Sequence, residues 1–353
     1  MTHPYAWPEV RRGAERIVVE TARCLSARGH RVTVLTSGSR LERHRDDRVT
    51  TLKLKRRLAD NAAHEKWFGR RIAPLLALGR FDAVHSLMPY DALAAVRTRR
   101  LGGHRVVYEE LGNPYRAHWN EIPDGEARRE LVRTVDVYGC MSTYSLHVLE
   151  REWGRHGDLI PGGVRLSEFV PASSRAAEPT ILFAGALDTP QKGLSDLLEA
   201  VGLLLEGRPT LEVWLSGSGD PSAIVAAAPT AVHDHVTLLP LGGANAQAER
   251  YGRAWVTSLP SRGDSFGLVL IESLAAGTPI VVADDGAPPQ LVTDSTGAVA
   301  PPGDIKALAA ALERGLQLAE DPATATACRT FATQFDWDTA IGPLLERLYG
   351  GAA

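Results

Sequence analysis

Short runs of β-branched and aliphatic residues alternate with helical stretches along almost the whole chain, and this alternation limits the possible folds more than any other feature. The first half places such runs at Val32–Thr36, Ala83–Leu87, Arg105–Tyr108 and Val135–Cys140. Strand, helix and strand repeated in this order favour right-handed βαβ units and therefore parallel sheets. The chain is predicted to be an α/β protein.

The helix before the first of these runs is the clearest local signal. Apolar and small residues recur there at helical spacing, and Gly29 stands where a glycine commonly ends a helix. The residues on this face are Ala14, Ile17, Val18, Thr21, Ala22 and Leu25.

A stretch without periodicity, rich in Pro, Gly, Ser and Ala, divides the chain after residue 163. Beyond it the alternation resumes, with a strand at Thr180–Ala184 and a helix near Phe266–Ala276. A chain of 353 residues suits two domains of roughly 150 residues each. We predict an N-terminal domain over 1–163, a linker over 164–179, a second domain over 180–334 and a terminal helix over 335–353.

The start of the chain departs from this pattern. A Rossmann-like domain opens with a buried strand that leads into its first glycine-containing turn, whereas here Pro4 and Pro8 precede Gly13. We expect most of that first strand to be missing from the sequence. The alternative is an N-terminal domain that tolerates the missing strand.

Composition excludes several classes of protein. The apolar fraction of 44% and the charged fraction of 23% are those of a globular protein, and a net charge of −3 gives no general reason to bind nucleic acid. The chain has three cysteines without CxxC spacing and lacks an apolar run of membrane-spanning length. We expect a cytoplasmic protein.

The segment Pro260–Val282 carries the strongest chemical signal. It reads as a strand, a polar turn and a helix that starts near Phe266, with Asp264 on the turn and Glu272 about two turns into the helix. The first backbone amides of a helix lack intrahelical partners and attract phosphate, so we expect a diphosphate at the amides of Ser265, Phe266, Gly267 and Leu268. Asp264 would then face a sugar attached to this diphosphate, and Glu272 would face the hydroxyls of a ribose attached to it. The alternative is that Asp264 only interacts favourably with the helix dipole and that Glu272 is an ordinary surface residue.

This segment resembles the E-x7-E motif of the retaining glycosyltransferases of family 4, which have the GT-B fold. Other pieces match in the same order along nearly the whole chain. They are Arg12–Arg16 with Arg28–Val34, Phe183–Gly185 with Lys192-Gly193, Gly217–Asp220, Thr296-Gly297 with Pro302–Asp304, and Phe335–Trp337 followed by a helix to Tyr349. The resemblance implies two Rossmann-like domains whose parallel sheets face each other across a cleft.

The resemblance also implies a reaction. A sugar would pass, with retention of configuration, from a UDP-, GDP- or dTDP-linked donor to a hydroxyl of a small molecule, such as an amino-sugar natural product, or of a glycan. Gly13 would approach the diphosphate and Lys192 would pair with its charge, while Gly185 and Gly217 would belong to the donor loops. Because the chain has no obvious Asp-x-Asp metal motif, we expect a metal-independent hexosyltransferase without a cofactor.

Several positions depart from the family pattern. Ala186 replaces the usual arginine, Arg12 replaces the first glycine of the Gly-Gly turn, and the first acid of the motif is Asp264 rather than Glu. We hypothesise that Arg12 supplies the charge that is missing at position 186; the alternative is that it points to solvent. Gln290, where Glu is common, is treated as peripheral.

The acceptor side is less defined. Members of the family often carry a histidine near the end of the Arg105–Tyr108 strand, where this chain has Glu109 and Glu110. One hypothesis is that Glu110, or Glu109, receives a cationic or polyhydroxylated acceptor; the alternative is a solvated pair of loop carboxylates. His85 and His118 are further candidates.

Residues 40–71 form a basic stretch with eleven Lys and Arg against five Asp and Glu. Such a patch could attract an anionic membrane, but large apolar residues are few, so a solvated face is favoured. A transferase acting on lipids or polysaccharides at a membrane therefore stays open as an alternative. A nucleotide-sugar epimerase of the same fold and a non-catalytic nucleotide-sugar-binding protein also stay open.

Overall fold

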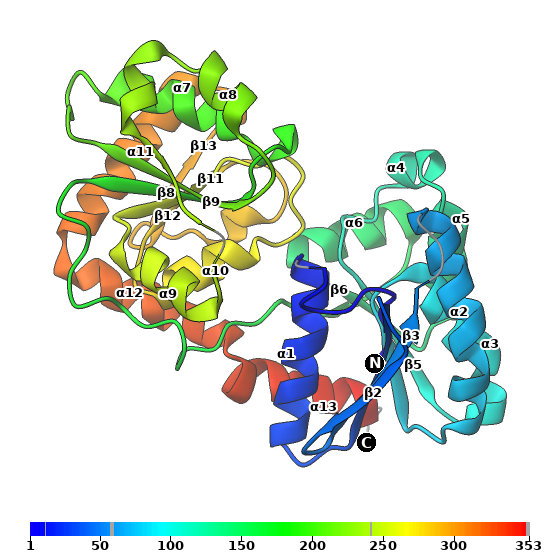
Figure 1. The fold of residues 1–353 in the computed structure, drawn as a ribbon. Helices are drawn as coiled ribbons and strands as arrows, with labels where there is room; N and C mark the ends of the chain where they lie inside the picture. The colour runs from blue at the N-terminus through cyan, green and yellow to red at the C-terminus, as the bar shows by residue number, and fades with distance from the viewer. Residues whose placement is uncertain (11, 57–59, 241, 351–353) are drawn as a thin grey trace. The chain divides into compact units, whose positions relative to one another are not determined.

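A computed structural model describes residues 1–10, 12–56, 60–240 and 242–350. The chain forms two compact units, Met1–Gly163 with Trp337–Ala353, and Val164–Asp336 (Figure 1). The chain thus crosses from the first unit to the second after residue 163 and returns after residue 336.

The first unit, here called the N-terminal unit, contains fifteen named elements among its described residues. They are α1 (Gly13–Ala27), β1 (Val32–Gly38), β2 (Glu42–Asp46), β3 (Val49–Lys55), α2 (Asn61–Leu78), β4 (Ala83–Ser86), α3 (Pro89–Gly102), β5 (Arg105–Glu110), α4 (Arg116–Glu121), α5 (Gly125–Thr134), β6 (Val137–Cys140), α6 (Thr143–Trp153), β7 (Asp158–Leu159), η5 (Trp337–Ile341) and α13 (Gly342–Gly350).

Its strands form two ladders, β1-β3-β2 and β4-β5-β6-β7. The first residues of the chain join them, because Thr2 makes parallel bridges to Leu35 of β1 and to Ser86 of β4. The amide of Thr2 donates to the His85 carbonyl at 2.9 Å, and the amide of His3 donates to the Leu35 carbonyl at 3.1 Å. Residues 1–3 therefore occupy the place of the expected first strand.

One strand contradicts the expectation of purely parallel sheets. β2 pairs antiparallel with β3, whereas β3 pairs parallel with β1. A tight reversal at Asp47, which has a left-handed φ of 47°, joins β2 to β3. The prediction missed this hairpin because it lies within the basic stretch, where charged residues hide the alternation.

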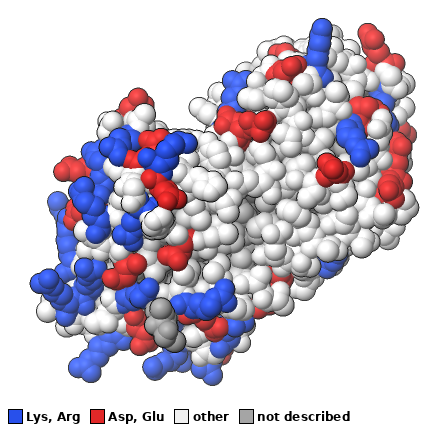
Figure 2. Space-filling model, turned by 180° about the vertical axis from the view of Figure 1, so that it is seen from behind, with Lys and Arg blue, Asp and Glu red and all other residues white. Residues whose placement is uncertain are grey.

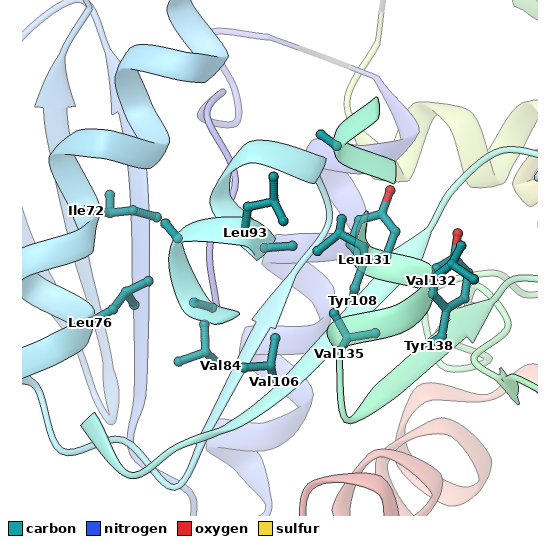
Figure 3. Close-up of a cluster of buried hydrophobic side chains, with 14 of the residues drawn as sticks. Ile72, Leu76, Val84, Leu93, Val106, Tyr108, Leu131, Val132, Val135 and Tyr138 are labelled. Carbon is teal, nitrogen blue, oxygen red and sulfur yellow. The ribbon is translucent and has the colours of Figure 1, made fainter. Parts of the chain in front are cut away.

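The core of the N-terminal unit lies between the β4–β6 part of the sheet and helices α2, α3 and α5. Figure 3 shows Ile72 and Leu76 of α2 and Leu93 of α3 turned toward Val84 and Val106 of the strands. Helices also contact the sheet elsewhere, since α13 lies against β5 and α1 against β1. Parallel strands that are covered on both faces read as continuous apolar runs, which explains the runs in the sequence.

The second unit, here called the C-terminal unit, contains sixteen elements among its described residues. They are β8 (Thr180–Ala186), η1 (Pro190–Lys192), α7 (Leu194–Leu204), β9 (Glu212–Ser218), α8 (Ser222–Ala227), η2 (Thr230–His235), β10 (Val236–Leu238), α9 (Ala244–Arg253), β11 (Val256–Leu259), α10 (Leu268–Ala275), β12 (Ile280–Ala283), η3 (Pro288–Leu291), β13 (Gly297–Ala300), α11 (Ile305–Glu320), α12 (Pro322–Ala332) and η4 (Thr333–Phe335).

The C-terminal sheet is parallel throughout, with the strand order β10-β9-β8-β11-β12-β13. Within the unit this is the order 3-2-1-4-5-6 of the Rossmann fold. The chain first adds strands on one side of β8 and then returns to add β11 on the other side. The direction of winding therefore reverses between β8 and β11.

Candidate functional site

The reversal between β8 and β11 identifies where a ligand is expected in the C-terminal unit. In open parallel sheets the loops that follow two such strands run to opposite faces and leave a crevice at the carboxyl edge. Here those loops are residues 187–193 after β8 and residues 260–267 after β11. They contain Lys192 and Asp264, which the sequence predicted to bind the donor.

Glycines allow the backbones at this edge to approach closely. The amide of Leu187 donates to the Ser218 carbonyl at 2.7 Å, so the chain leaving β8 stays paired with the end of β9. A Cβ atom at Gly217 would overlap the carbonyl oxygen of Gly185, and Gly185 itself has a φ of 156°. The two predicted donor-loop glycines are thus in direct backbone contact, in a geometry that a side chain at 217 would prevent.

The loops after β8 and β11 are also joined to each other. The amide of Arg262 donates to the Gln191 carbonyl at 2.8 Å. Gly193 has a left-handed φ of 76°, and a Cβ there would overlap the carbonyl of Pro260. These contacts hold the backbone on both sides of Lys192 against the loop that carries Asp264.

Lys192 and Asp264 form an ion pair across the crevice, with Nζ 2.7 Å from Oδ2. The lysine side chain is 32% exposed and the aspartate side chain 13%. On its other side the Asp264 carbonyl accepts a hydrogen bond from the amide of Ala287 at 2.9 Å. Residues 72 positions apart therefore meet at the predicted site.

The helix of the motif begins two residues later than predicted. α10 starts at Leu268, after Gly267, whose φ of 97° is left-handed. Phe266 lies before the helix, and its ring is buried edge-on against Phe335 at 5.6 Å between centroids. By helix geometry the amides of Leu268 and Val269 have no intrahelical acceptor, whereas the amide of Leu270 donates to the Gly267 carbonyl at 2.9 Å. Ser265 precedes this turn, and Glu272 is buried within α10.

This arrangement can hold an anion with a polar group attached. A lysine ammonium and a helix N-terminus both attract phosphate oxygens. A carboxylate accepts hydrogen bonds and therefore suits hydroxyl groups. The Lys192 ammonium, the N-terminus of α10 and the Asp264 carboxylate lie on the two neighbouring loops at this edge of the sheet.

In the N-terminal unit, Gly13 is the first residue of α1 and Arg12 caps it. The Arg12 guanidinium pairs with the buried carboxylate of Glu15 at 2.7 Å and lies 4.9 Å from the centroid of the Tyr5 ring. The side chain of Arg12 is 57% exposed. Arg12 thus has an ion-pair partner inside its own unit. That it also binds the diphosphate of the donor stays a prediction.

Both hypotheses for Glu110 assumed an accessible carboxylate, and the structure corrects this. Glu110 is buried and lies 2.5 Å from the Arg128 guanidinium, which also binds Asp124 at 2.8 Å. The Tyr108 hydroxyl and the Gly112 amide donate to the same carboxylate at 3.0 and 3.1 Å. Glu110 is therefore the centre of a buried hydrogen-bond network.

Burial and these charges shift the neighbouring pKa values. Burial lowers the pKa of Arg128, but the Glu110, Tyr108 and Asp124 side chains raise it further, so that it lies well above its ordinary value. Burial raises the pKa of the Tyr108 hydroxyl well above its ordinary value; Arg128 lowers this pKa, and the Glu110 carboxylate raises it further. Sequence reasoning missed Arg128, which lies on α5, 18 residues after Glu110.

Glu109 points to the other face of the sheet, as alternation along β5 requires. It is also buried, and its Oε2 lies 3.0 Å from Nε2 of His85 on β4. Nδ1 of His85 is 2.8 Å from the Tyr349 hydroxyl of α13. Two of the acceptor candidates, Glu109 and His85, thus meet each other and the terminal helix, whereas His118 is exposed on α4.

The basic stretch forms the β2–β3 hairpin and much of α2. Lys53 is paired with Glu9 at 3.1 Å and with Glu42 at 3.3 Å. In Figure 2, Lys and Arg gather on the N-terminal unit with Asp and Glu among them. A cavity of about 570 Å³ lies between α1 and this hairpin, lined by Val18, Ala22 and Val34 among others. It is in a different unit from Lys192 and Asp264, and we do not assign the donor to it.

Residues 1–10, 12–56, 60–240 and 242–350 contain no group of three or more His, Cys, Asp or Glu placed to hold a metal ion. None of the helices in them is both long and apolar enough to cross a bilayer.

Comparison with known proteins gives the family. The family "Glycosyltransferase Family 4" matches residues 11–168, and the family "Glycosyl transferases group 1" matches residues 178–317. A GDP-mannose-dependent monoacylated alpha-(1-6)-phosphatidylinositol monomannoside mannosyltransferase of Corynebacterium glutamicum is 25% identical over 65% of each chain. A D-inositol 3-phosphate glycosyltransferase of Streptomyces avermitilis is 36% identical over 54% of this chain and 46% of its own.

Solved structures agree on the fold. A sucrose-phosphate synthase of Thermosynechococcus elongatus superposes with a TM-score of 0.83 at 21% identity, over 97% of this chain and 94% of its own. HepE of Anabaena, solved in complex with UDP-glucose, superposes with a TM-score of 0.77 at 14% identity, over 99% and 98%. The chain spans 65% or less of the length of the two curated relatives named above. Two matching family descriptions, one for each unit, and these superpositions show that the chain belongs to glycosyltransferase family 4 and has the GT-B fold.

Proposed function

We propose that the protein transfers a hexosyl group from a nucleotide sugar to a hydroxyl of a polyhydroxylated ring, such as inositol or a phosphoinositol headgroup, with retention of configuration. The observation that carries the proposal is the Lys192–Asp264 pair beside the N-terminus of α10. A donor of this class joins an anionic diphosphate to a sugar rich in hydroxyl groups. The two ends of the donor match the two kinds of group at this edge.

Charge stabilisation is the chemistry that these residues can supply. As the bond between sugar and phosphate breaks, negative charge grows on the leaving diphosphate. A fixed ammonium and helix amides stabilise such charge without reorganising at the moment of reaction. Lys192 and the amides around Leu268 would take this role, Asp264 would hold a sugar hydroxyl, and Glu272 would hold the ribose. These groups do the work without a metal ion, and Gly13 and Arg12 stay predictions from the sequence alone.

The names of the relatives support the acceptor class. Both curated relatives named above have inositol in the name of the compound on which they act, one as a free phosphate and one within a lipid. The sequence had favoured a small-molecule or glycan acceptor, which a phosphorylated inositol satisfies. Lipid-linked and free inositol share the same polyhydroxylated ring. We therefore propose this ring as the acceptor, and the experiment below distinguishes the lipid-linked form from the free form.

Donor binding can be tested by thermal unfolding with UDP-, GDP- and dTDP-linked hexoses. A ligand at one hundred times its dissociation constant stabilises the native state by about 2.7 kcal/mol. Lys192→Ala should weaken binding by about 1.5–3 kcal/mol, the range of a hydrogen bond to a charged group. Lys306→Ala is the matched control, because Lys306 is the other lysine between residues 164 and 336 and is exposed on α11.

Transfer should then be measured with the donor that binds. One arm supplies inositol phosphate in solution and the other supplies phosphatidylinositol in detergent micelles. We expect one of the two to be glycosylated, with the anomeric configuration of the donor retained in the product by NMR. Failure of every nucleotide sugar to stabilise the wild-type protein would refute the donor assignment, and turnover of neither acceptor would refute the acceptor class.

A further inference from the structure

The Lys192–Asp264 pair has a consequence for which ligand the site prefers. The Lys192 ammonium, which should meet the diphosphate, pairs with the Asp264 carboxylate at 2.7 Å. The two side chains are 32% and 13% exposed, so solvent screens the pair only in part. Any diphosphate that binds Lys192 must therefore come close to the negative charge of Asp264.

Contacts with neighbouring residues hold the main chain of Asp264 in place. The Asp264 carbonyl accepts from the Ala287 amide at 2.9 Å, and a Cβ at Gly286 would overlap that carbonyl. The neighbouring Arg262 amide is bonded to the Gln191 carbonyl, one residue before Lys192. Both charged residues are thus held on backbones that are fixed to each other.

An intact donor and its product differ at the atoms that meet this carboxylate. The donor presents sugar hydroxyls, which can donate hydrogen bonds to a carboxylate that only accepts. A free nucleoside diphosphate presents a terminal phosphate instead, which ionises a second time near pH 6 and so carries additional negative charge at neutral pH. Asp264 therefore attracts the first ligand and repels the second.

We propose that Asp264 is a specificity-determining residue that makes the site favour an intact nucleotide sugar over the free nucleoside diphosphate, by neutralising Lys192 whenever no sugar stands between them. The proposal rests on the donor site argued above. It gives Asp264 a task beyond holding a sugar hydroxyl, because the carboxylate also promotes departure of the spent nucleotide after transfer.

The test compares two ligands on two variants by calorimetric titration. The ligands are the nucleotide sugar that binds the wild type and its matching nucleoside diphosphate. Asp264→Asn keeps the shape of the side chain and removes its charge. We expect this variant to bind the nucleoside diphosphate about tenfold more tightly, as for the loss of one unit charge a few ångströms away in a partly solvated site. Its affinity for the nucleotide sugar should fall or stay the same.

Two further variants separate charge from fold. Asp264→Glu keeps the charge and should preserve the preference of the wild type. Asp196→Asn removes a carboxylate at the same sheet edge that pairs with Arg262 at 3.1 Å and not with Lys192, so it should leave the ratio of the two affinities unchanged. Because that ratio is measured within each variant, a general loss of folded protein does not change it.

The outcomes are distinct. A ratio of affinities that shifts toward the nucleoside diphosphate in Asp264→Asn alone supports the proposal. Equal gains for both ligands, no change, or the same shift in Asp196→Asn would overturn it while leaving the donor site intact. If the wild type binds neither ligand, the donor assignment itself fails, and the specificity proposal fails with it.

Discussion

Removing Arg128 should destabilise the N-terminal unit strongly, because it would leave Glu110 buried without its cation. The carboxylate is 2% exposed and lies 2.5 Å from the guanidinium, whose own side chain is 15% exposed. Breaking a buried pair by deleting one partner costs about 3–5 kcal/mol. We therefore expect Arg128→Met to lose an amount of that size, a large part of the 5–15 kcal/mol typical of a folded domain.

The loss should be visible as a lower unfolding temperature of this unit. For a domain of 150–250 residues each kcal/mol corresponds to about 2–4 °C, so the shift should be about 6–20 °C. Hydrogen exchange on peptides of β5 and α5 would follow the N-terminal unit specifically. Arg97→Met is the matched control, because Arg97 reaches Glu130 at 3.8 Å with 68% of its side chain exposed. Such surface pairs contribute about 0–1 kcal/mol.

A double variant makes the reasoning refutable. Glu110→Gln combined with Arg128→Met removes both charges and leaves an amide that Tyr108 and Gly112 can still bind. It should be more stable than Arg128→Met alone by about 2 kcal/mol or more, since the penalty comes from the uncompensated charge. A loss below about 1 kcal/mol in Arg128→Met, with no recovery in the double variant, would mean that Glu110 behaves as a solvated carboxylate. Acceptor turnover of a stable double variant would then show whether Glu110 acts on substrate.

Two other predictions follow from single contacts. Gly217→Ala should abolish stabilisation by a nucleotide sugar and lower the stability of the C-terminal unit by about 1–3 kcal/mol. The reason is that a Cβ at position 217 would overlap the Gly185 carbonyl. Gly207→Ala is the control for thermal unfolding and should have little effect, because a Cβ there meets only an atom 3.9 Å away. Hydrogen bonds from Arg28 and then His30 lower the pKa of Glu346 from 4.5 to about 2. Because the folded pKa is the lower one, the stabilisation of α13 by this carboxylate is complete above pH 4.5 and is lost as the pH falls through 2. Glu346→Gln should remove that pH dependence from hydrogen exchange of α13 at a cost below about 1 kcal/mol at neutral pH, and an unchanged acid profile would contradict the assignment.

The donor half could be predicted largely from the sequence, because its signals are local. A strand buried on both faces reads as an apolar run, and a turn that needs a left-handed residue reads as a glycine. Gly29 ends the first helix as predicted, with a φ of 96°. Lys192 and Asp264, 72 residues apart, meet because each follows one of two adjacent parallel strands.

The N-terminal half was harder to predict, because its structure depends on contacts between residues far apart in the sequence. The β2–β3 hairpin consists mostly of charged and polar residues, so its pairing with β1 depends on the sheet rather than on its own apolar pattern. The burial of Glu109 and Glu110 depends on Arg128, His85 and Tyr349, which lie between 18 and 240 residues away and have no spacing that marks them as partners. The helix of the motif was placed two residues early, because Gly267 has a left-handed φ of 97° and separates Phe266 from the first helical residue.

The two carboxylates at the end of β5 show how one strand can place adjacent acids in two different environments. Alternation sends Glu110 toward α5, where Arg128 neutralises it, and Glu109 toward α13, where His85 and Tyr349 lie. A buried charge is tolerated only with a partner. Each of the two carboxylates therefore has a partner on its own face of the sheet. The terminal helix is therefore joined to the polar end of β5 through Tyr349 and His85. Because α13 follows the return of the chain from the C-terminal unit, the carboxyl end of β5 and α13 belong to one structural unit.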